Sequence, residues 1–502
     1  MEVEFKFQVP ADSRKAIEKE LRSAKVTRTH LLARYFDTEN GVLASHGVAL
    51  RLRKEGRRWV QTAKALGDGA VHRLEHNADL GAVRGAPPAV DASRHRGTPV
   101  GERLDALLGE AGQPLIETFA TDIWRTARRV QEGATTVELA LDIGRVYAPA
   151  AGERAERSSP VCELELELVE GEVAGLVALA QRWSQQHGLW FSTVSKAERG
   201  ERLRAQEPDR PRAVKAKPPQ VAGEKAVAGG EVQRAVLAAC LGQVLPNATE
   251  VAAGSEDAEV IHQLRVGIRR LRSALRELEP LAPGRFDAAW EPPLVEAFRA
   301  LGAQRDRELL VTSLQPRLLA AGSPPIVLPE EEGEAAPSAR EVVQAPKFQA
   351  ALVSLIGFAA PPDVTPEADK DEAQATRRAL AKGLNKLHRQ VTRDGKRFEG
   401  LASEDQHRVR KRLKRLRYLA EFVAPLFDKQ RAERYIQRLL PAQDALGEFN
   451  DEVVALATYG EAVAQEPRAW FAVGWLTALR PGKARACRKT LGGLAKARKF
   501  WK

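Results

Sequence analysis

The stretch EVEFKFQV, residues 2–9, alternates strictly between polar and apolar side chains. Successive side chains of a β-strand point to opposite faces, so the pattern predicts a strand with Glu2, Glu4 and Lys6 on one face. The phenylalanine and valine side chains then share the opposite face, which can pack on a core. Burying two carboxylates and an ammonium group in a dry core costs free energy, whereas a wet, ligand-filled cavity accommodates them. The polar face is therefore either solvated or part of a polar cavity.

The same alternation continues through the first 205 residues. It recurs in residues 48–54, 71–77, 137–142 and 161–169. Helical spacing of apolar residues interrupts it mainly at residues 13–23 and 173–187. Many amphipathic strands with few helices predict an antiparallel sheet or a closed barrel.

The charged residues on these predicted faces sort by strand. Carboxylates gather at Glu2 and Glu4, at Glu138 and Asp142, and at Glu163 and Glu165. Cations gather at Lys6, Arg51, Arg53, Lys64, Arg73 and Arg125. If the faces line one interior, the carboxylates would hold Mg²⁺ or Mn²⁺ through oxygen ligands, and the cations would bind phosphate oxygens. Such charge stabilisation is what phosphoryl transfer mostly requires.

The chain changes character near residue 206. Residues 206–219, QEPDRPRAVKAKPP, are rich in proline and basic residues and indicate a linker. Apolar residues of the following part fall at helical spacing almost throughout. We therefore predict an α+β protein of two domains. The first is a strand-rich domain over residues 1–205, and a linker over 206–222 follows it. The second is an all-α domain over 223–502, with halves at about 223–345 and 376–502.

Two segments of the helical part repeat one basic pattern at a spacing of 145 residues. The first contains His262, Arg265, Arg269, Arg270 and Arg272, with Arg276 one turn further on. The second contains His407, Arg410, Lys414, Arg415 and Arg417. At the same shift, Leu301, Gly302 and Asp306 recur as Leu446, Gly447 and Asp451. Two matches at one spacing indicate a duplicated helical unit.

Most of these basic residues share one helix face, because offsets of 0, 3, 7 and 10 residues return to the same side. A row of like charges destabilises its helix unless an anion lies beside it, so a linear polyanion is the expected ligand and a solvated face is the alternative. Nucleic-acid modules usually add aromatic side chains for stacking or side chains that read base edges. Within residues 262–276 and 407–418, Tyr418 is the one aromatic residue. The pattern therefore favours polyphosphate over nucleic acid.

The net charge supports this division. The chain carries 78 Lys and Arg residues against 67 Asp and Glu residues, a formal charge of +11. Residues 1–200 hold 28 of each sign, so the whole excess lies in residues 201–502. A surface that serves solubility would spread the charge more evenly, whereas this distribution indicates that the helical part meets an anion.

The ordered motifs of the first part resemble the CYTH superfamily, the triphosphate tunnel metalloenzymes. The motifs are ExExK at 2–6, RYFDT at 34–38, ALRLR at 49–53, TAK at 62–64, RLE at 73–75, TDIWR at 121–125, ELALDIG at 138–144, CELELE at 162–167 and SKAERG at 195–200. The resemblance implies an eight-stranded antiparallel tunnel that binds a triphosphate with a divalent ion, Mg²⁺ or Mn²⁺.

The resemblance also implies a role for each tunnel residue. Metal ligands would be Glu2, Glu4, Glu75, Glu138, Asp142, Glu163 and Glu165. Substrate-binding residues would be Lys6, Arg51, Arg53, Lys64, Arg73, Arg125 and Lys196. Residues acting in catalysis would be Lys6, Arg53, Lys64 and Glu165. Glu167 shares the parity of the tunnel face but would lie at its exit.

The two basic repeats resemble the CHAD domain, the conserved histidine α-helical domain. The motifs are HxxRVxxRRxR at 262–272, HRVRKRLKRLRYLAEF at 407–422, LGAQRD at 301–306 and LGEFND at 446–451. The family implies two pseudo-symmetric helical bundles around a basic groove that binds inorganic polyphosphate. The His, Arg and Lys residues of both repeats would then be its polyphosphate-binding residues.

Together these resemblances imply metal-dependent hydrolysis of inorganic tripolyphosphate in the tunnel, with long-chain polyphosphate bound by the helical domain. Three alternatives stay open: a granule-associated polyphosphate-binding protein with a vestigial tunnel, a class IV-type adenylyl cyclase, and a thiamine triphosphatase. The oligomeric state is not given by the sequence. With three scattered cysteines, no signal peptide and no apolar run approaching the roughly 20 residues of a membrane helix, we expect a cytoplasmic protein without a membrane partner.

Overall fold

The chain folds into two compact units in a computed structural model. The first contains residues 1–215, 241–264 and 339–363, and the second contains residues 216–240, 265–338 and 364–502. The structure describes residues 2–67, 72–83, 86–109, 114–150, 155–205, 212–221, 227–329, 337–360 and 368–502. Side chains not described within these ranges are those of Glu2, Leu66, His72, Arg73, Val311 and residues 303–309.

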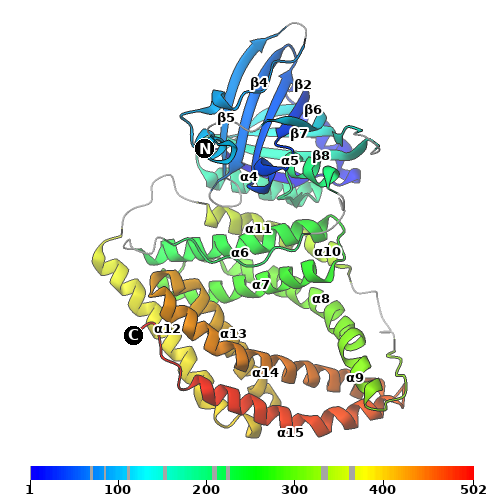
Figure 1. Ribbon diagram of the computed structural model, residues 1–502, viewed down its shortest axis with the longest axis vertical. Helices are drawn as coiled ribbons and strands as arrows, with labels where there is room; N and C mark the ends of the chain where they lie inside the picture. Colours follow the sequence, from blue (N-terminus) through cyan, green and yellow to red (C-terminus); the bar gives the residue numbers. More distant parts are fainter. Residues whose placement is uncertain are drawn as a thin grey trace. The chain divides into compact units, whose positions relative to one another are not determined.

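In its described residues, the first unit contains one closed antiparallel sheet of nine strands (Figure 1). The strands are β1 (Glu2–Gln8), β2 (Thr27–Asp37), β3 (Val48–Glu55), β4 (Arg58–Leu66), β5 (His72–Ala82), β6 (Ile116–Glu132), β7 (Thr135–Ala148), β8 (Arg157–Glu170) and β9 (Trp190–Phe191). Their order is β5-β4-β3-β2-β6-β7-β8-β1-β9, and β1 also pairs with β5.

Pairing of Val3 with His72 closes eight of the strands into a ring. The ninth strand, β9, pairs with Phe7 and Gln8 at the other end of β1. The predicted eight-stranded tunnel is therefore confirmed, with one strand more than expected. Two residues are too few to show an alternating pattern, which is why the sequence did not reveal β9.

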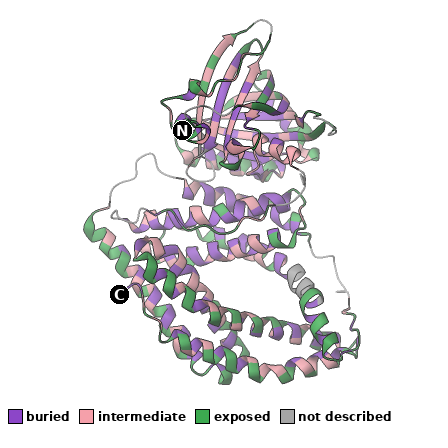
Figure 2. Ribbon diagram, in the orientation of Figure 1, coloured by how far each residue is buried: buried purple, intermediate pink, exposed green. Residues whose placement is uncertain are grey.

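The strands of the ring separate an apolar outer face from a polar interior. On β1, Phe5 and Phe7 are fully buried, and each ring centre lies 6.1 Å from that of Phe191. Glu4 and Lys6, on the opposite face, line an interior cavity. Figure 2 shows the resulting alternation of buried and partly exposed residues along the strands. The strand predicted from residues 2–9 is confirmed, and its polar face belongs to a cavity.

Helices pack around the ring within the first unit. They are α1 (Arg14–Leu21), α2 (Val42–Ser45), α3 (Pro99–Leu108), α4 (Val173–His187), α5 (Lys196–Arg204), α10 (Ala339–Gln344), α11 (Pro346–Ala359) and the C-terminal part of α6 (Gly229–Ala252). Helix α11 lies against α4 (Figure 1). Gly357 permits this contact, because a Cβ atom there would lie 2.4 Å from Cγ2 of Val177.

Helix α6 is the described helix that is long and apolar enough to cross a membrane. Of its most apolar window, 78% is buried within the protein, as in a core helix. Polar side chains on α6 are buried as well, and Asn247 donates from Nδ2 to the backbone oxygen of Val214 at 2.8 Å. These partners suit a helix in a protein interior.

The second unit contains helices and no strand among its described residues. Its main helices are α8 (Glu291–Leu309), α9 (Gln315–Ala320), α12 (Lys370–Gly395), α13 (Ser403–Val423), α14 (Lys429–Ala462) and α15 (Ala469–Leu494), with most of α7 (Ala258–Leu278). Near the C-terminus, Phe500 and Trp501 are buried against Tyr435 of α14, with ring centres 5.6 and 4.8 Å apart. The prediction of a helical second part is confirmed.

Candidate active site

Inward-facing side chains of the ring line two adjoining cavities. Their volumes are about 920 and 550 Å³, and both are bordered by Glu4, Arg51, Lys64, Glu165 and Lys196. Every predicted tunnel residue whose side chain is described lines one or both cavities. The two others, Glu2 and Arg73, lie outside the described side chains. The motifs, spread over almost 200 residues, thus converge on one interior.

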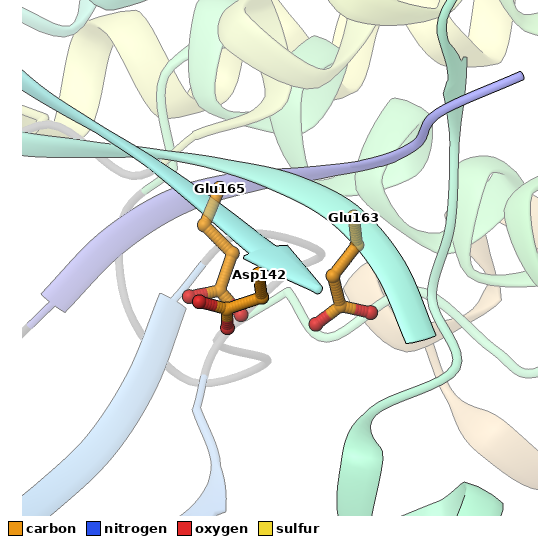
Figure 3. A group of neighbouring side chains, drawn as sticks. All are labelled: Asp142, Glu163 and Glu165. Atoms are coloured by element: carbon orange, nitrogen blue, oxygen red, sulfur yellow. The ribbon is translucent and has the colours of Figure 1, made fainter. Parts of the chain in front are cut away.

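Three carboxylates form a tight group in this interior. Asp142 on β7 and Glu163 and Glu165 on β8 each offer an oxygen, and these oxygens lie within 4.8 Å of one another (Figure 3). The pairing of β7 with β8 sets Asp142 opposite Glu163, and strand alternation brings Glu165 onto the same face. Hard divalent cations prefer such oxygen ligands. The donor set of this group therefore fits a Mg²⁺ or Mn²⁺ ion.

Two protein cations neutralise the carboxylate group. Nζ of Lys196 lies 2.7 Å from Asp142 and 2.9 Å from Glu165, and it also contacts Glu163. Nε of Arg125 donates to Asp142 at 2.7 Å, and its guanidinium also contacts Glu165. The side chains of Asp142 and Glu163 have no exposed surface, so these ion pairs offset the cost of burying them.

The same contacts keep Glu165 ionised. Burial by itself would raise the pKa of Glu165, but Lys196 and Arg125 hold that pKa well below its usual value. Burial would likewise lower the pKa of Lys196, yet Asp142, Glu163 and Glu165 raise that pKa well above its usual value. An arriving metal ion would therefore meet a charged carboxylate at Glu165, as metal ligation requires.

Two further cations stand on the opposite wall, on β3 and β4. Arg51 donates to the hydroxyl of Tyr35 at 3.3 Å, and Lys64 contacts Glu75 of β5. Guanidinium and ammonium groups bind phosphate oxygens through charge-assisted hydrogen bonds. The interior thus sets two cationic groups, which could bind phosphate oxygens, across from the carboxylates.

Lys6 and Arg53 are the remaining predicted cations whose side chains the structure describes. Burial lowers the pKa of Lys6, whose Nζ donates to the backbone oxygen of Val194 at 2.5 Å. Burial and the neighbouring Arg51 lower the pKa of Arg53, which contacts Glu55. The Nζ of Lys6 and the guanidinium of Arg53 carry more N–H donors than these contacts use, so further donors are left for a ligand.

Glu167 is a carboxylate of the tunnel face that the sequence placed at the tunnel exit and to which it gave no role. It stands directly opposite Glu4 on β1 and Glu138 on β7, and it lines the smaller cavity. Burial, together with Glu138 and Glu4, raises the pKa of Glu167. In the sequence, the alternation of Glu167 with Glu163 and Glu165 indicated that it shares their strand face, and the structure shows that it lines the smaller cavity.

The first basic repeat lies along α7. Arg265 is buried, Arg269 and Arg272 are partly exposed, and Arg276 is exposed. The guanidinium carbons of the first three lie 5.4, 5.1 and 6.0 Å from the ring centre of Phe298 on α8. An aromatic ring distant in sequence therefore joins this row, and the residues that neighbour the first basic repeat in the sequence give no sign of it.

Two predicted polyphosphate-binding residues join α7 to α13 through ion pairs. Arg270 contacts Glu421, and its guanidinium carbon lies 5.4 Å from the ring centre of Tyr418. Nε of Arg415 donates to Glu277 at 2.5 Å. Both arginines occupy offset 8 of their repeat, which lies about 80° from the first position and away from the row at offsets 3, 7 and 10. These two guanidinium groups therefore connect the repeats to each other.

The second basic repeat lies along α13. The side chain of His407 is exposed, and its Nδ1 lies 3.2 Å from Oδ1 of Asn450. Partial burial and the surrounding cations, led by Lys411, lower the pKa of His407. The other repeat residues with partly exposed side chains are His262 on α7 and Arg410, Lys414, Arg415 and Arg417 on α13. Asp306 of the recurring LGAQRD motif lies outside the described side chains.

Two family models match the chain. The CYTH domain model matches residues 1–200, and the CHAD domain model matches residues 235–459. The chain carries a CYTH domain followed by a CHAD domain. The α+β architecture agrees with this assignment, since the closed sheet falls in the CYTH part and helices make up the CHAD part.

A curated relative of the CYTH–CHAD chain is named inorganic triphosphatase and comes from Haemophilus influenzae. The two are 28% identical over 172 residues, which cover 33% of this chain and 44% of the relative. The chain therefore matches less than half the length of that relative.

Solved structures resemble each domain in turn. The CHAD domain from the plant Ricinus communis is 25% identical, with a TM-score of 0.40 over 58% of this chain and 98% of that chain. A proposed adenylyl cyclase from Hippeastrum, described as having a dominant triphosphatase activity, is 19% identical, with a TM-score of 0.29 over 41% of this chain and 95% of that chain.

Proposed function

We propose that the CYTH domain hydrolyses inorganic tripolyphosphate with the help of Mg²⁺ or Mn²⁺. The observation that carries the proposal is the carboxylate group of Asp142, Glu163 and Glu165, which lines the two adjoining cavities that Arg51 and Lys64 also line. Phosphoryl transfer needs little more from a protein than positioning and charge stabilisation. The CYTH family and the triphosphatase relative support the same activity.

The proposed roles follow from the two walls of the interior. A bound divalent ion would neutralise charge on the phosphate oxygens, and Asp142, Glu163 and Glu165 would hold it, with Glu2, Glu4, Glu75 and Glu138 as further proposed ligands. The tripolyphosphate oxygens would accept hydrogen bonds from Lys6, Arg51, Arg53, Lys64, Arg73, Arg125 and Lys196.

In the proposed reaction, a water oxygen attacks the terminal phosphorus and the bridging P–O bond breaks, which yields phosphate and diphosphate. Arg53 and Lys64 donate hydrogen bonds to the transferring phosphoryl group, and Lys6 fixes the chain beside it. The low pKa of Glu165 favours a role in holding the metal ion over a role as general base. Each of these residues acts by binding and orientation, as the largely dissociative chemistry of phosphoryl transfer allows.

The experiment compares Arg53→Ala and Glu165→Gln with controls at the end of β8 and in the turn that follows β3. Arg57→Ala and Glu170→Gln change exposed residues near the ends of β3 and β8. We expect both tunnel variants to lose metal-dependent phosphate release from tripolyphosphate by at least about 100-fold, the scale of removing one charge-stabilising group. The controls should stay within about twofold. Undiminished turnover in both tunnel variants would contradict the proposal.

A substrate panel separates the alternatives. Tripolyphosphate, ATP, thiamine triphosphate and long-chain polyphosphate are each tested with Mg²⁺ and with Mn²⁺. Cyclic AMP from ATP would identify an adenylyl cyclase, and preference for thiamine triphosphate would identify a thiamine triphosphatase. Polyphosphate binding without any hydrolysis would identify a binding protein with a vestigial tunnel.

For the CHAD domain the proposal is binding of long-chain inorganic polyphosphate along the two basic rows. Partly exposed guanidinium groups such as Arg269 and Arg410 support it, as does the positive excess of residues 201–502. Such a ligand would place the protein in the cytoplasm, and polyphosphate granules are the second proposed location. Tethered polymer would also raise the local concentration of phosphate chains near the enzyme.

The binding test reverses charge on both rows. Arg269→Glu with Arg410→Glu should abolish polyphosphate binding, while Arg377→Glu with Arg378→Glu, two exposed residues of α12, changes the net charge equally and should retain it. Wild-type affinity should fall steeply as salt rises, by analogy with counterion release from nucleic acids. Affinity that is equal at low and high salt would contradict the electrostatic basis of the proposal.

A further inference from the structure

The segment that carries Lys196 is held by buried side chains from the CHAD domain. Residues 190–196 lead from β9 to α5. The backbone N–H of Phe191 donates to Oε1 of Gln349 at 2.9 Å, and that of Thr193 donates to Oγ1 of Thr249 at 3.1 Å. Gln349 is 1% exposed and Thr249 is 2% exposed. Both acceptors lie within residues 235–459, the part matched by the CHAD family, yet they belong to the first compact unit.

The same segment positions two tunnel cations. The backbone oxygen of Val194 accepts a hydrogen bond from Nζ of Lys6 at 2.5 Å. Ser195 caps α5 by accepting from the N–H of Glu198 at 3.0 Å, and Lys196 is the first residue of that helix. A shift of the segment would therefore move both ammonium groups with respect to the carboxylates.

Further contacts fix the two acceptors themselves. Nε2 of Gln349 donates to the backbone oxygen of Val343 at 2.7 Å, which orients its amide so that Oε1 faces Phe191. Glu250, next to Thr249 on α6, contacts Arg202 at the other end of α5. The start and the end of α5 are thus both tied to α6 or its neighbours.

We propose that Thr249 and Gln349 are positioning residues of the tunnel, through which the CHAD domain completes the CYTH active site. A buried backbone N–H needs an acceptor, and losing one leaves the donor unsatisfied. The segment would then shift or exchange with other conformations, and a small misplacement of a catalytic group lowers the rate considerably. The expected loss of activity rests on the proposed function, the hydrolysis of tripolyphosphate. The expected shift of residues 190–196 does not depend on that function.

The experiment uses the full chain with isosteric changes. Thr249→Val removes the acceptor hydroxyl and keeps the volume, Thr249→Ser restores the hydroxyl, and Gln349→Leu removes the second acceptor. Gln243→Leu is the matched control, because Gln243 is a 1% exposed residue of the same helix whose amide donates to Gln263. We expect kcat/KM for tripolyphosphate to fall about five- to tenfold in Thr249→Val and in Gln349→Leu, the factor of one lost hydrogen bond. Thr249→Ser and Gln243→Leu should stay within about twofold.

Hydrogen exchange gives a readout that does not depend on turnover. The amides of residues 190–196 should exchange at least about tenfold faster in Thr249→Val and Gln349→Leu, and at the wild-type rate in Gln243→Leu. Unchanged exchange of this segment in both variants would overturn the inference, even if activity fell. If the wild-type protein hydrolyses no triphosphate, the proposed function is wrong. Hydrogen exchange of residues 190–196, together with calorimetric binding of tripolyphosphate, then still tests whether Thr249 and Gln349 position the segment. Should Thr249→Val fail to fold, Gln349→Leu decides it.

Discussion

Replacing Lys196 with methionine tests how the carboxylate group of the tunnel is stabilised. Nζ of Lys196 contacts Asp142, Glu163 and Glu165, and the lysine side chain is 13% exposed. Methionine keeps most of the length and removes the charge. After the change, Arg125 still contacts Asp142 and Glu165 of the group. Glu163 then loses its ammonium partner in a fully buried position.

The expected cost comes from leaving buried carboxylates without a partner. Removing one member of a buried ion pair typically costs about 3–5 kcal/mol. Arg125 continues to neutralise part of the group, so we expect the low end, about 3 kcal/mol. For a unit of this size, 1 kcal/mol shifts Tm by about 2–4 °C, so the unfolding of the first unit should begin about 6–12 °C lower.

A divalent ion should reverse this loss, because it would take the place of the missing positive charge. A ligand at 100 times its Kd stabilises the folded state by about 2.7 kcal/mol. In wild type the ion has to share the carboxylates with Lys196, whereas in Lys196→Met it does not. The rise in Tm on adding Mn²⁺ should therefore be larger in the variant than in wild type.

The assay is differential scanning calorimetry in EDTA and in Mn²⁺, with Lys19→Met, an exposed lysine of α1, as the control. The control should unfold like wild type in both conditions. The reasoning is refuted if Lys196→Met unfolds within about 1 °C of wild type in EDTA, since such a shift corresponds to well under 1 kcal/mol. It is also refuted if Mn²⁺ raises Tm equally in both proteins, because Lys196 and the ion would then not share a site.

Three further changes probe the rest of the molecule. Arg415→Glu should lower the free energy of unfolding, measured by urea titration, by about 2 kcal/mol through repulsion from Glu277. The double variant Arg415→Glu with Glu277→Arg, which exchanges the two charges, should recover most of this loss. A double variant as unstable as Arg415→Glu alone would count against the ion pair. Burial lowers the pKa of His388 from 6.5 to about 4. Between these two pH values the unfolded chain binds a proton at His388 and the folded chain does not, so the free energy of unfolding should fall as the pH falls from 6.5 to 4. In His388→Gln the free energy of unfolding should change less steeply with pH. Trp501→Ala, which empties the contact with Tyr435, should cost about 3 kcal/mol; a loss below about 1 kcal/mol would show that this end of the chain adds little.

The strands of the CYTH domain could be predicted because one face of each strand is apolar and the other is charged. Alternation over residues 2–9 and 161–169 specified which side chains share a face, and the ring confirms both segments as β1 and part of β8. It could not specify which strands become neighbours, because pairing depends on residues far apart in sequence. The approach of Asp142 to Glu163 across β7 and β8 is therefore visible only in the structure.

The contacts that hold Lys196 could not be predicted from sequence for a related reason. Thr249 and Gln349 lie on helices whose apolar spacing indicates burial and nothing about a polar role. A buried threonine or glutamine produces no periodic pattern in the sequence, because its role depends on which backbone N–H lies within hydrogen-bonding distance in the fold. The family boundaries also separate these residues from the tunnel, whereas the compact unit contains both.

In the basic repeats, the number of charges in the sequence does not tell which arginines can bind a ligand. Arg270 and Arg415 belong to the same motifs as the neighbouring arginines, but helix geometry turns them by about 80° away from the first position of the row, toward Glu421 and Glu277. A guanidinium that already neutralises a partly buried carboxylate has to break that pair before it can bind a phosphate, so it adds little to ligand affinity. The helix face, more than the motif, therefore separates the arginines that join α7 to α13 from those, such as the partly exposed Arg269, for which we propose polyphosphate binding.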